Sequence, residues 1–134
     1  MQPRVVLADT GPLLALADES DQYHSRANEE FARLEAEGRE FLFAYPIVME
    51  TYGVMRRHLY ASVALQWLKV VIEDGSVINP KDADYREAFE LLSRFDDQDI
   101  SLFDATLAIL SQRLEVAVWT FDGDFDVLGA AVWR

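Results

Sequence analysis

The sequence contains no cysteine, and this absence excludes three kinds of chemistry at once. The chain cannot form disulfides, bind a metal through thiolates or use a cysteine nucleophile. It also lacks any apolar run near the roughly 18–20 residues that span a bilayer, and no signal peptide opens it. We therefore expect a cytoplasmic protein that does not associate with a membrane.

Basic residues are scarce as well. The chain has 12 Lys and Arg against 24 Asp and Glu, which gives a net charge of −12 at pH 7. Such a chain repels nucleic acid as a whole, because phosphate binding normally comes from clustered Lys and Arg. Any role with nucleic acid must then depend on a local site, a bound metal or a basic partner. Either some of the acids gather in a cation-binding cleft, or all of them are spread over solvated helix faces.

Apolar residues make up 51% of the 134 residues, which argues against disorder and allows one domain spanning residues 1–134. Helical and strand-like patterns alternate along the chain, which predicts an α/β fold with a mostly parallel sheet covered by helices. We predict strands at residues 4–8, 40–44, 76–78, 116–121 and 130–133, the last of these at an edge of the sheet. We predict helices at residues 13–17, 22–37, 47–59, 61–73, 82–95 and 101–114.

The last predicted helix carries an acid, Asp104, in its first turn. Its leucines recur at three- and four-residue steps, which marks one buried face, and Asp104 lies on or next to that face. The positive amino end of a helix favours an anion there. A simpler interpretation is that Asp104 or Ser101 only caps the helix. Because Ser101 can fill that role, Asp104 is left without an obvious capping function. The leucines are Leu107, Leu110 and Leu114.

Other acids occupy comparable positions. Asp9 follows the first predicted strand, although it could simply cap the next helix. Asp122 follows the strand at 116–121, with Asp124 close by, and Glu50 lies in the first turns of the helix that Pro46 opens. Parallel strands end at one edge of a sheet, and the helices that follow them begin there. The geometry of an α/β fold therefore permits these acids to share one cleft.

Carboxylates that share a cleft repel one another, by about 4 kcal/mol per pair at roughly 4 Å in an intermediate dielectric. Either their pKa values shift or a cation lies among them. Oxygen ligands without His or Cys favour Mg²⁺ or Mn²⁺ over Zn²⁺. Such an ion keeps water ligands, one of which can act as a nucleophile, and it offsets charge on a phosphoryl group. The chemistry that needs this arrangement is metal-assisted phosphodiester hydrolysis.

Four motifs in order resemble the PIN-domain family, and in particular the VapC-type toxin ribonucleases of toxin–antitoxin pairs. The resemblance runs nearly end to end and includes Gly11, where many relatives have Ser. The motifs are Asp9-Thr-Gly-Pro-Leu-Leu-Ala-Leu, Pro46 followed by Glu50, Ser101-Leu-Phe-Asp104-Ala and Thr120-Phe-Asp122. The resemblance implies a three-layer α/β/α fold and Mg²⁺- or Mn²⁺-dependent cleavage of RNA.

By these motifs, Asp9 and Asp104 map to the principal metal ligands, Glu50 to the third acid and Asp122 to the fourth. Asp124 matches a further acid that follows the fourth. As a hypothesis, Glu50 orients or deprotonates the attacking water, and Asp122 completes the metal site. The resemblance implies that Thr10 and Ser101 orient these ligands.

The cluster Arg56-Arg57 closes the third predicted helix. We expect these arginines to contact the RNA backbone, although cations at a helix carboxyl end are also ordinary partners of the helix dipole. The resemblance further implies a homodimer and a small antitoxin whose tail covers the cleft.

Other classes of phosphate-handling protein fit the sequence less well. A receiver domain needs an acceptor Asp after a middle strand and a Lys after a late one, and neither is correctly placed here. A dehalogenase-type phosphatase needs Asp-x-Asp after the first strand, and Asp9-Thr-Gly lacks the second Asp. A flap-cleaving nuclease needs insertions for which this chain has no room. Two alternatives remain open within the fold, namely a catalytically silent PIN-fold binding partner and a housekeeping RNA-processing nuclease.

Overall fold

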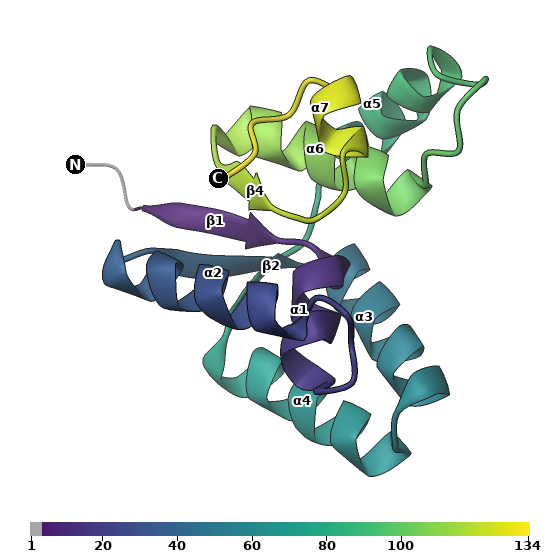
Figure 1. The fold of residues 1–134 in the computed structure, drawn as a ribbon. Helices are drawn as coiled ribbons and strands as arrows, with labels where there is room; N and C mark the ends of the chain where they lie inside the picture. The colour runs from purple at the N-terminus through teal and green to yellow at the C-terminus, as the bar shows by residue number, and fades with distance from the viewer. Residues whose placement is uncertain (1–3) are drawn as a thin grey trace.

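A four-stranded parallel sheet forms the centre of the protein, whose computed structural model describes residues 4–134 (Figure 1). The strands lie in the order β3-β2-β1-β4, and all three pairings are parallel. The sequence-based prediction of an α/β fold with a mostly parallel sheet is confirmed. The strands are β1 (Val5–Ala8), β2 (Glu40–Ala44), β3 (Ser76–Ile78) and β4 (Ala117–Trp119).

Helices cover both faces of this sheet. The described residues form α1 (Thr10–Ala17), α2 (His24–Ala36), α3 (Tyr45–His58), α4 (Ala61–Asp74), α5 (Asp82–Ser93), α6 (Leu102–Leu114) and α7 (Asp124–Val127). Right-handed crossovers from β1 to β2 and from β2 to β3 carry α1 to α4 to one face. The return crossover from β3 to β4 carries α5 and α6 to the other face (Figure 1). The three-layer α/β/α arrangement follows.

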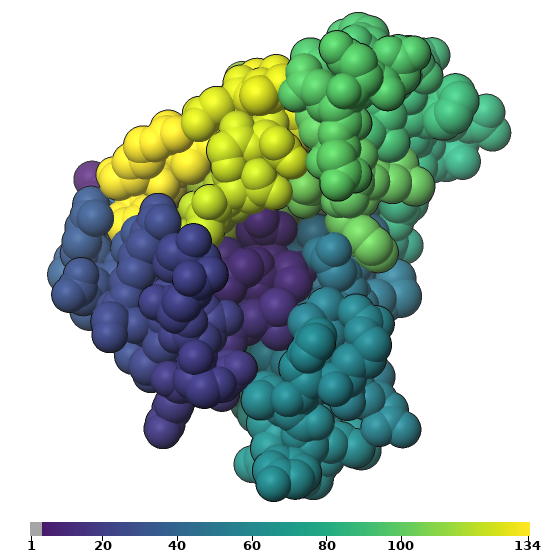
Figure 2. All heavy atoms as spheres, turned by 45° about the vertical axis from the view of Figure 1, so that its right-hand side comes forward, coloured from purple at the N-terminus to yellow at the C-terminus, as the bar shows by residue number. Residues whose placement is uncertain are grey.

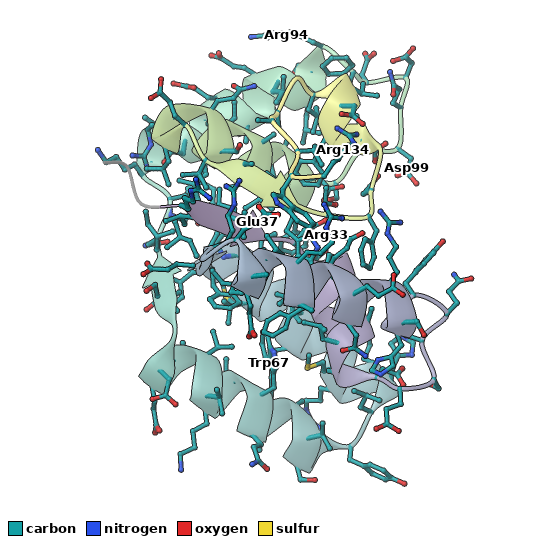
Figure 3. The ribbon with its side chains drawn as sticks, turned by 60° about the vertical axis from the view of Figure 1, so that its left-hand side comes forward. Arg33, Glu37, Trp67, Arg94, Asp99 and Arg134 are labelled. Carbon is teal, nitrogen blue, oxygen red and sulfur yellow. The ribbon has the colours of Figure 1, made fainter. Side chains whose placement is uncertain are left out.

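The core forms between the sheet and α6. Residues 6–8 of β1 are fully buried, as expected for a central strand covered on both faces. Residues 105–111 of α6 are all buried, so this helix has apolar contacts on more than the single face that its leucine spacing predicts. It packs against α5 on its outer side. On the opposite face, Trp67 of α4 packs against the core (Figure 3).

Two predictions for the carboxyl-terminal segment are wrong. The expected edge strand at 130–133 is reduced to a single parallel bridge between Val132 and Val118. The preceding segment folds into the short helix α7, which was not predicted, and then turns at Gly129, whose φ is 77°. Elsewhere, α1 begins at Thr10, three residues before the predicted helix, because Asp9 turns directly from the strand into it.

The order of the strands fixes where a ligand can bind. From β1 the chain moves to β2 and β3, and it then returns to β4 on the other side of β1. Crevices at such a reversal, outside the carboxyl ends of the strands, are the usual ligand sites of open α/β sheets. The backbone N–H of Asp9 donates to the carbonyl of Trp119 (3.0 Å), so β1 and β4 end side by side. No helix within residues 4–134 is long and apolar enough to cross a bilayer.

Candidate metal centre

A cavity of about 490 Å³ opens at the carboxyl ends of β1 and β4. Figure 2 shows this region hollowed, with the purple amino-terminal segment recessed among the blue, teal, green and yellow surfaces around it. Segments from five parts of the chain contribute to its wall. The lining residues are Asp9, Thr10, Gly11, Leu14, Asp21, Tyr23, Glu50, Ser101, Asp104, Phe121, Asp122 and Gly123.

Asp9 is the most deeply placed acid of the cavity. It directly follows β1, and only 5% of its surface is exposed. Its side chain makes no capping hydrogen bond to α1, which removes the simpler interpretation offered for it. Its Oδ2 instead accepts a hydrogen bond of 2.7 Å from the Thr120 hydroxyl at the end of β4. The two strand ends at the reversal are thereby joined through an acid of the cavity.

Asp104 enters the cavity from the first turn of α6. Ser101 is the residue that caps this helix, because its hydroxyl oxygen accepts the Asp104 N–H at 3.1 Å. The side chain of Asp104 therefore has no capping role, as its sequence position suggested. It is half-buried near the amino end of α6, directly before the buried residues 105–111. Ser101 thus fixes the backbone that carries this carboxylate.

Glu50 reaches the same cavity from α3. Since α3 begins at Tyr45, two residues before the predicted helix, Glu50 lies in its second turn. The hydroxyl of Thr10 donates to Glu50 Oε1 at 2.5 Å, and the hydroxyl of Thr51 donates to Thr10 Oγ1 at 3.0 Å. A chain of two threonines therefore holds the position of this carboxylate.

Asp122 lies in the loop between β4 and α7, and Asp124 is the first residue of α7. The N–H of Asp122 donates to Thr120 Oγ1 (2.9 Å), and the N–H of Asp124 donates to Asp122 Oδ1 (2.9 Å). This tight turn brings both side chains toward α6. Carboxylate oxygens of Asp104, Asp122 and Asp124 lie within 4.8 Å of one another, which is a spacing that one metal ion can bridge.

Burial, together with repulsion from neighbouring acids, raises the pKa values of Asp9, Asp104 and Asp124. Burial raises the pKa of Asp9 from 3.8 to about 6, against the opposing hydrogen bond from Thr120, and the charges of Glu50 and Asp122 add to the rise. Burial also raises the pKa of Asp104 to about 7, with the negative charge of Asp9 as the next cause. Burial, followed by the charge of Asp122, raises the pKa of Asp124. The cluster therefore resists full ionisation.

No Lys, Arg or His from the described part of the chain lines this cavity. Five acids line it, and the structure supplies no side-chain cation there to offset their charge. The donor set is entirely carboxylate and hydroxyl oxygen, which fits a hard divalent cation such as Mg²⁺ or Mn²⁺. The same donor set gives Zn²⁺ none of the nitrogen or sulfur ligands that it usually takes.

The structure brings together most of the residues that the sequence singled out. Asp9, Glu50, Asp104 and Asp122 share the cavity with Thr10 and Ser101, and Asp124 joins the carboxylate group from just outside it. Arg56 and Arg57 do not line it, because they lie in the last turn of α3. About six residues of helix separate them from Glu50, a rise of roughly 9 Å.

Four residues that contact or line the site were not singled out. Asp21 and Tyr23 line the cavity, and of the two only Tyr23 falls within a predicted element, the helix at residues 22–37. Thr51 and Thr120 hold Glu50 and Asp9 through hydrogen bonds. Thr120 does carry a signal, since it is a hydroxyl residue at a strand end two positions before an acid. Asp21 carries none, because its approach depends on how α2 folds back.

A family model for the PIN domain matches residues 6–131, so the chain belongs to the PIN-domain family. No curated protein sequence matches the chain significantly. The solved structures that it resembles extend over nearly the whole chain. VapC20 of Mycobacterium tuberculosis, a sarcin-ricin loop cleaving toxin, is 23% identical with a TM-score of 0.83, and the match covers 96% of this chain and 98% of that one.

Two further structures share the fold at lower identity. VapBC2 from Rickettsia felis, bound to a promoter DNA fragment, is 10% identical with a TM-score of 0.73, over 97% of this chain and 99% of that one. FitAcB from Neisseria gonorrhoeae is 16% identical with a TM-score of 0.69, over 96% of both chains. At these identities the likeness is one of fold, and what the acids do has to be argued from their own geometry.

Proposed function

We propose that this protein is a Mg²⁺- or Mn²⁺-dependent endoribonuclease and the toxin of a toxin–antitoxin pair. The observation that carries the proposal is the group of carboxylates from Asp104, Asp122 and Asp124, within 4.8 Å of one another beside a cavity lined by no basic residue of the described chain. Membership of the PIN-domain family and the fold shared with VapC20, a sarcin-ricin loop cleaving toxin, support it.

In this proposal Asp9, Asp104, Asp122 and Asp124 hold the cation, and Glu50 orients or deprotonates the attacking water. A bound Mg²⁺ or Mn²⁺ would supply the charge that lowers the pKa of a water and offsets the negative charge of the phosphoryl group. Thr10 donates its hydroxyl proton to Glu50 Oε1, which leaves Oε2 available to accept a proton from water. This bond also fixes the rotamer of Glu50, so the base is in place before the substrate binds.

Thr120 and Ser101 serve to position these acids. Thr120 donates to Asp9 Oδ2, so the second oxygen of this buried acid is the one that remains for a cation. Ser101 accepts the N–H of Asp104 and orders the first turn of α6. Each hydroxyl restrains a carboxylate without adding a positive charge that would compete with the metal.

The proposed partners follow from charge and apolar exposure. A small antitoxin with a basic tail would complement a cavity that carries five acids, and an Arg placed among them would compete with the cation. A homodimer agrees with the exposed apolar side chains Val63, Leu65, Val70 and Ile72 on α4. A cytoplasmic location is part of the same proposal.

The silent-partner alternative is disfavoured by the acids themselves. A protein without catalysis gains nothing from a buried Asp9 whose pKa is raised to about 6, since the ionised cluster destabilises the fold. A housekeeping RNA-processing nuclease would use the same site. A neighbouring gene for a small DNA-binding antitoxin separates the toxin from that alternative.

Substitution of Asp104 by Asn tests the proposal most simply. We expect cleavage of RNA in Mg²⁺ to fall about 1,000-fold or more, because the amide removes a charged ligand from the cluster. The matched control is Asp96→Asn, which removes an exposed carboxylate from the loop before α6 and should cleave at the wild-type rate. If purified Asp104→Asn protein cleaves RNA as fast as the control, with contaminating nuclease excluded, the proposal is wrong.

A further inference from the structure

A second cavity of about 280 Å³ adjoins the acidic one, and the two share Phe121, Asp122 and Gly123 as a common wall. Its character is different, because three arginines line it: Arg26 and Arg33 from α2, and Arg134 at the end of the chain. Figure 3 shows Arg33 and Arg134 on the same side of the molecule, where α2 meets the carboxyl-terminal segment. Three of the chain's 12 basic residues therefore gather beside its most acidic region.

Aromatic rings hold two of these guanidinium groups in place. Arg26 lies over the ring of Phe121 at 4.3 Å, and Arg33 lies over the ring of Trp133 at 4.6 Å. Trp133 is itself fixed, since it is 6% exposed and its Nε1 donates to Glu37 at 3.1 Å. Guanidinium groups stacked in this way lose less freedom when they bind an anion, because their planes are already oriented.

These arginines keep most of their hydrogen-bonding capacity. Arg26 uses its Nε to pair with Glu30 (2.8 Å), and Arg134 uses one terminal nitrogen to pair with Asp126 (2.6 Å). Each guanidinium has five N–H donors, so each pair leaves donors free. Arg33 forms no ion pair with any residue from 4 to 134.

The acids of this second cavity are partly committed elsewhere. Glu30 also accepts the indole N–H of Trp119 at 2.8 Å, which directs one of its oxygens into the core. Asp122 faces the acidic cavity as well, where it belongs to the carboxylate group with Asp104 and Asp124. The three arginines of this cavity therefore face three acids, Glu30, Asp122 and Asp126, whereas the chain as a whole carries a net charge of −12.

We propose that Arg26 and Arg33, with Arg134 beside them, bind a phosphate of the single-stranded RNA next to the one that is cleaved. This inference rests on the proposed nuclease function. An RNA strand whose scissile phosphate lies among the acids crosses Phe121–Gly123 into the arginine cavity, because the two cavities share that wall. Aromatic rings combined with arginines are the usual platform for single-stranded nucleic acid.

Arg56 and Arg57, which the sequence favours for RNA binding, are less well placed. They lie in the last turn of α3 and line neither the acidic cavity nor the arginine cavity. Arg134 is about 100 residues away from Arg26 and Arg33 in the sequence, so no local pattern predicts that the three arginines share a cavity. The substrate path inferred here runs from α6 across the β4–α7 loop to α2.

The test compares Arg26→Ala/Arg33→Ala with a matched double variant, Arg86→Ala/Arg94→Ala. Both lose two positive charges, and both lose one i,i+4 pair made through Nε, since Arg86 pairs with Asp82 as Arg26 pairs with Glu30. Arg94 is exposed like Arg33 and lies at the far end of the molecule (Figure 3). Binding is measured by fluorescence anisotropy in EDTA, with a labelled mixed-sequence RNA of about ten nucleotides.

We expect Arg26→Ala/Arg33→Ala to weaken RNA binding about tenfold and to reduce the salt slope of log Kd by about 0.7, the value for the loss of one phosphate contact on a single strand. Its KM for the same RNA in Mg²⁺ should rise while kcat stays unchanged, and cleavage of a dinucleotide, which is too short to reach α2, should be unaffected. Arg86→Ala/Arg94→Ala should match the wild type. If Arg26→Ala/Arg33→Ala does not fold, Arg26→Lys/Arg33→Lys should keep the salt slope and bind about threefold more weakly.

Equal weakening by the two double variants, or no weakening by either, overturns the inference, because the arginines would then act only through net charge or not at all. The nuclease proposal is tested separately by the wild-type protein. A wild type that binds RNA and never cleaves it refutes the nuclease, while the comparison of the double variants still decides whether the arginine cavity holds the strand.

Discussion

Two aspartates of this protein are almost equally buried and have opposite electrostatics. Asp84, on α5, is 2% exposed, and Asp9, after β1, is 5% exposed. Asp84 accepts two hydrogen bonds of 2.8 Å from Arg113 of α6 and a third from the N–H of Lys81. These bonds hold the pKa of Asp84 below its usual value, whereas burial raises the pKa of Asp9 to about 6.

The two carboxylates differ in whether a basic side chain of the protein neutralises them. Around Asp84 the chain supplies a bidentate arginine and a helix cap, so the charge is neutralised within the protein. Around Asp9 it supplies the Thr120 hydroxyl, the backbone N–H of Thr10 and further acids, but no basic side chain of the described residues lines the cavity. Burying a charge without a partner is unfavourable unless a ligand later provides one. The lack of a basic side chain from residues 4–134 in this cavity therefore supports the proposed metal site, beside the group of carboxylates from Asp104, Asp122 and Asp124.

The largest effect on stability should come from breaking the satisfied pair. Substitution of Arg113 by Ala leaves Asp84 buried without its cation, and we expect unfolding free energy to fall by about 3 kcal/mol at pH 7. Urea denaturation followed by circular dichroism measures it. Arg86→Ala, which breaks an exposed ion pair on the same helix as Asp84, should change stability by less than about 0.5 kcal/mol. Equal losses in the two variants would show that Asp84 is not held as described.

Substitution of Asp9, which has no basic partner, should change stability in the opposite direction. Because the folded pKa of Asp9 is about 6 and its ordinary value is 3.8, its contribution to stability is complete below about pH 4 and is lost as pH rises through about 6. Two pKa units correspond to about 3 kcal/mol. Asp9→Asn should therefore stabilise the metal-free protein by about 2 kcal/mol at pH 8, since the buried amide still has a desolvation cost.

Denaturation in EDTA at several pH values checks this sign. The gain from Asp9→Asn should vanish near pH 3.5, where the carboxyl group is protonated in both folded and unfolded chains. The exposed Asp96→Asn variant should show no such pH dependence. A destabilised Asp9→Asn protein at pH 8 would contradict the assignment of Asp9 as an unpaired buried charge.

The smallest effect should come from the hydroxyl that orders Asp104. Ser101→Ala removes the cap of α6 and should lower stability by about 1 kcal/mol. If Ser101 also positions the Asp104 carboxylate, RNA cleavage should fall about tenfold, as for other residues that orient metal ligands. Ser101→Thr, which keeps the hydroxyl, should restore most of both losses. Full activity in Ser101→Ala would limit this residue to capping.

Local sequence patterns predicted the features that depend only on residues close together in the chain. The strands at 40–44 and 76–78 were predicted at the bounds that the structure has, because apolar β-branched and aromatic residues there are flanked by clear turns. The role of Ser101 as the cap of α6 also follows from residues within one turn. The alternation of strands and helices permits acids at the strand ends to share one cleft, and the resemblance to the PIN-domain family implied which acids do so.

Contacts between distant residues could not be predicted in this way. Thr10 and Glu50 are separated by 40 residues, and Asp9 and Thr120 by 111, so no local pattern pairs them. The helix α7 was missed because four residues are too few to show a helical period. The arginine cavity needs α2 and the final residue of the chain together, which only the folded structure brings about.

The central claim is that acids far apart in the sequence share one divalent cation. Crystals of the protein soaked in Mn²⁺ test it directly through the anomalous signal of the ion. We expect a peak at the cavity, within about 2.5 Å of carboxylate oxygens from at least two of Asp9, Asp104, Asp122 and Asp124. An empty cavity at saturating Mn²⁺, or an ion bound only elsewhere on the surface, would contradict the account.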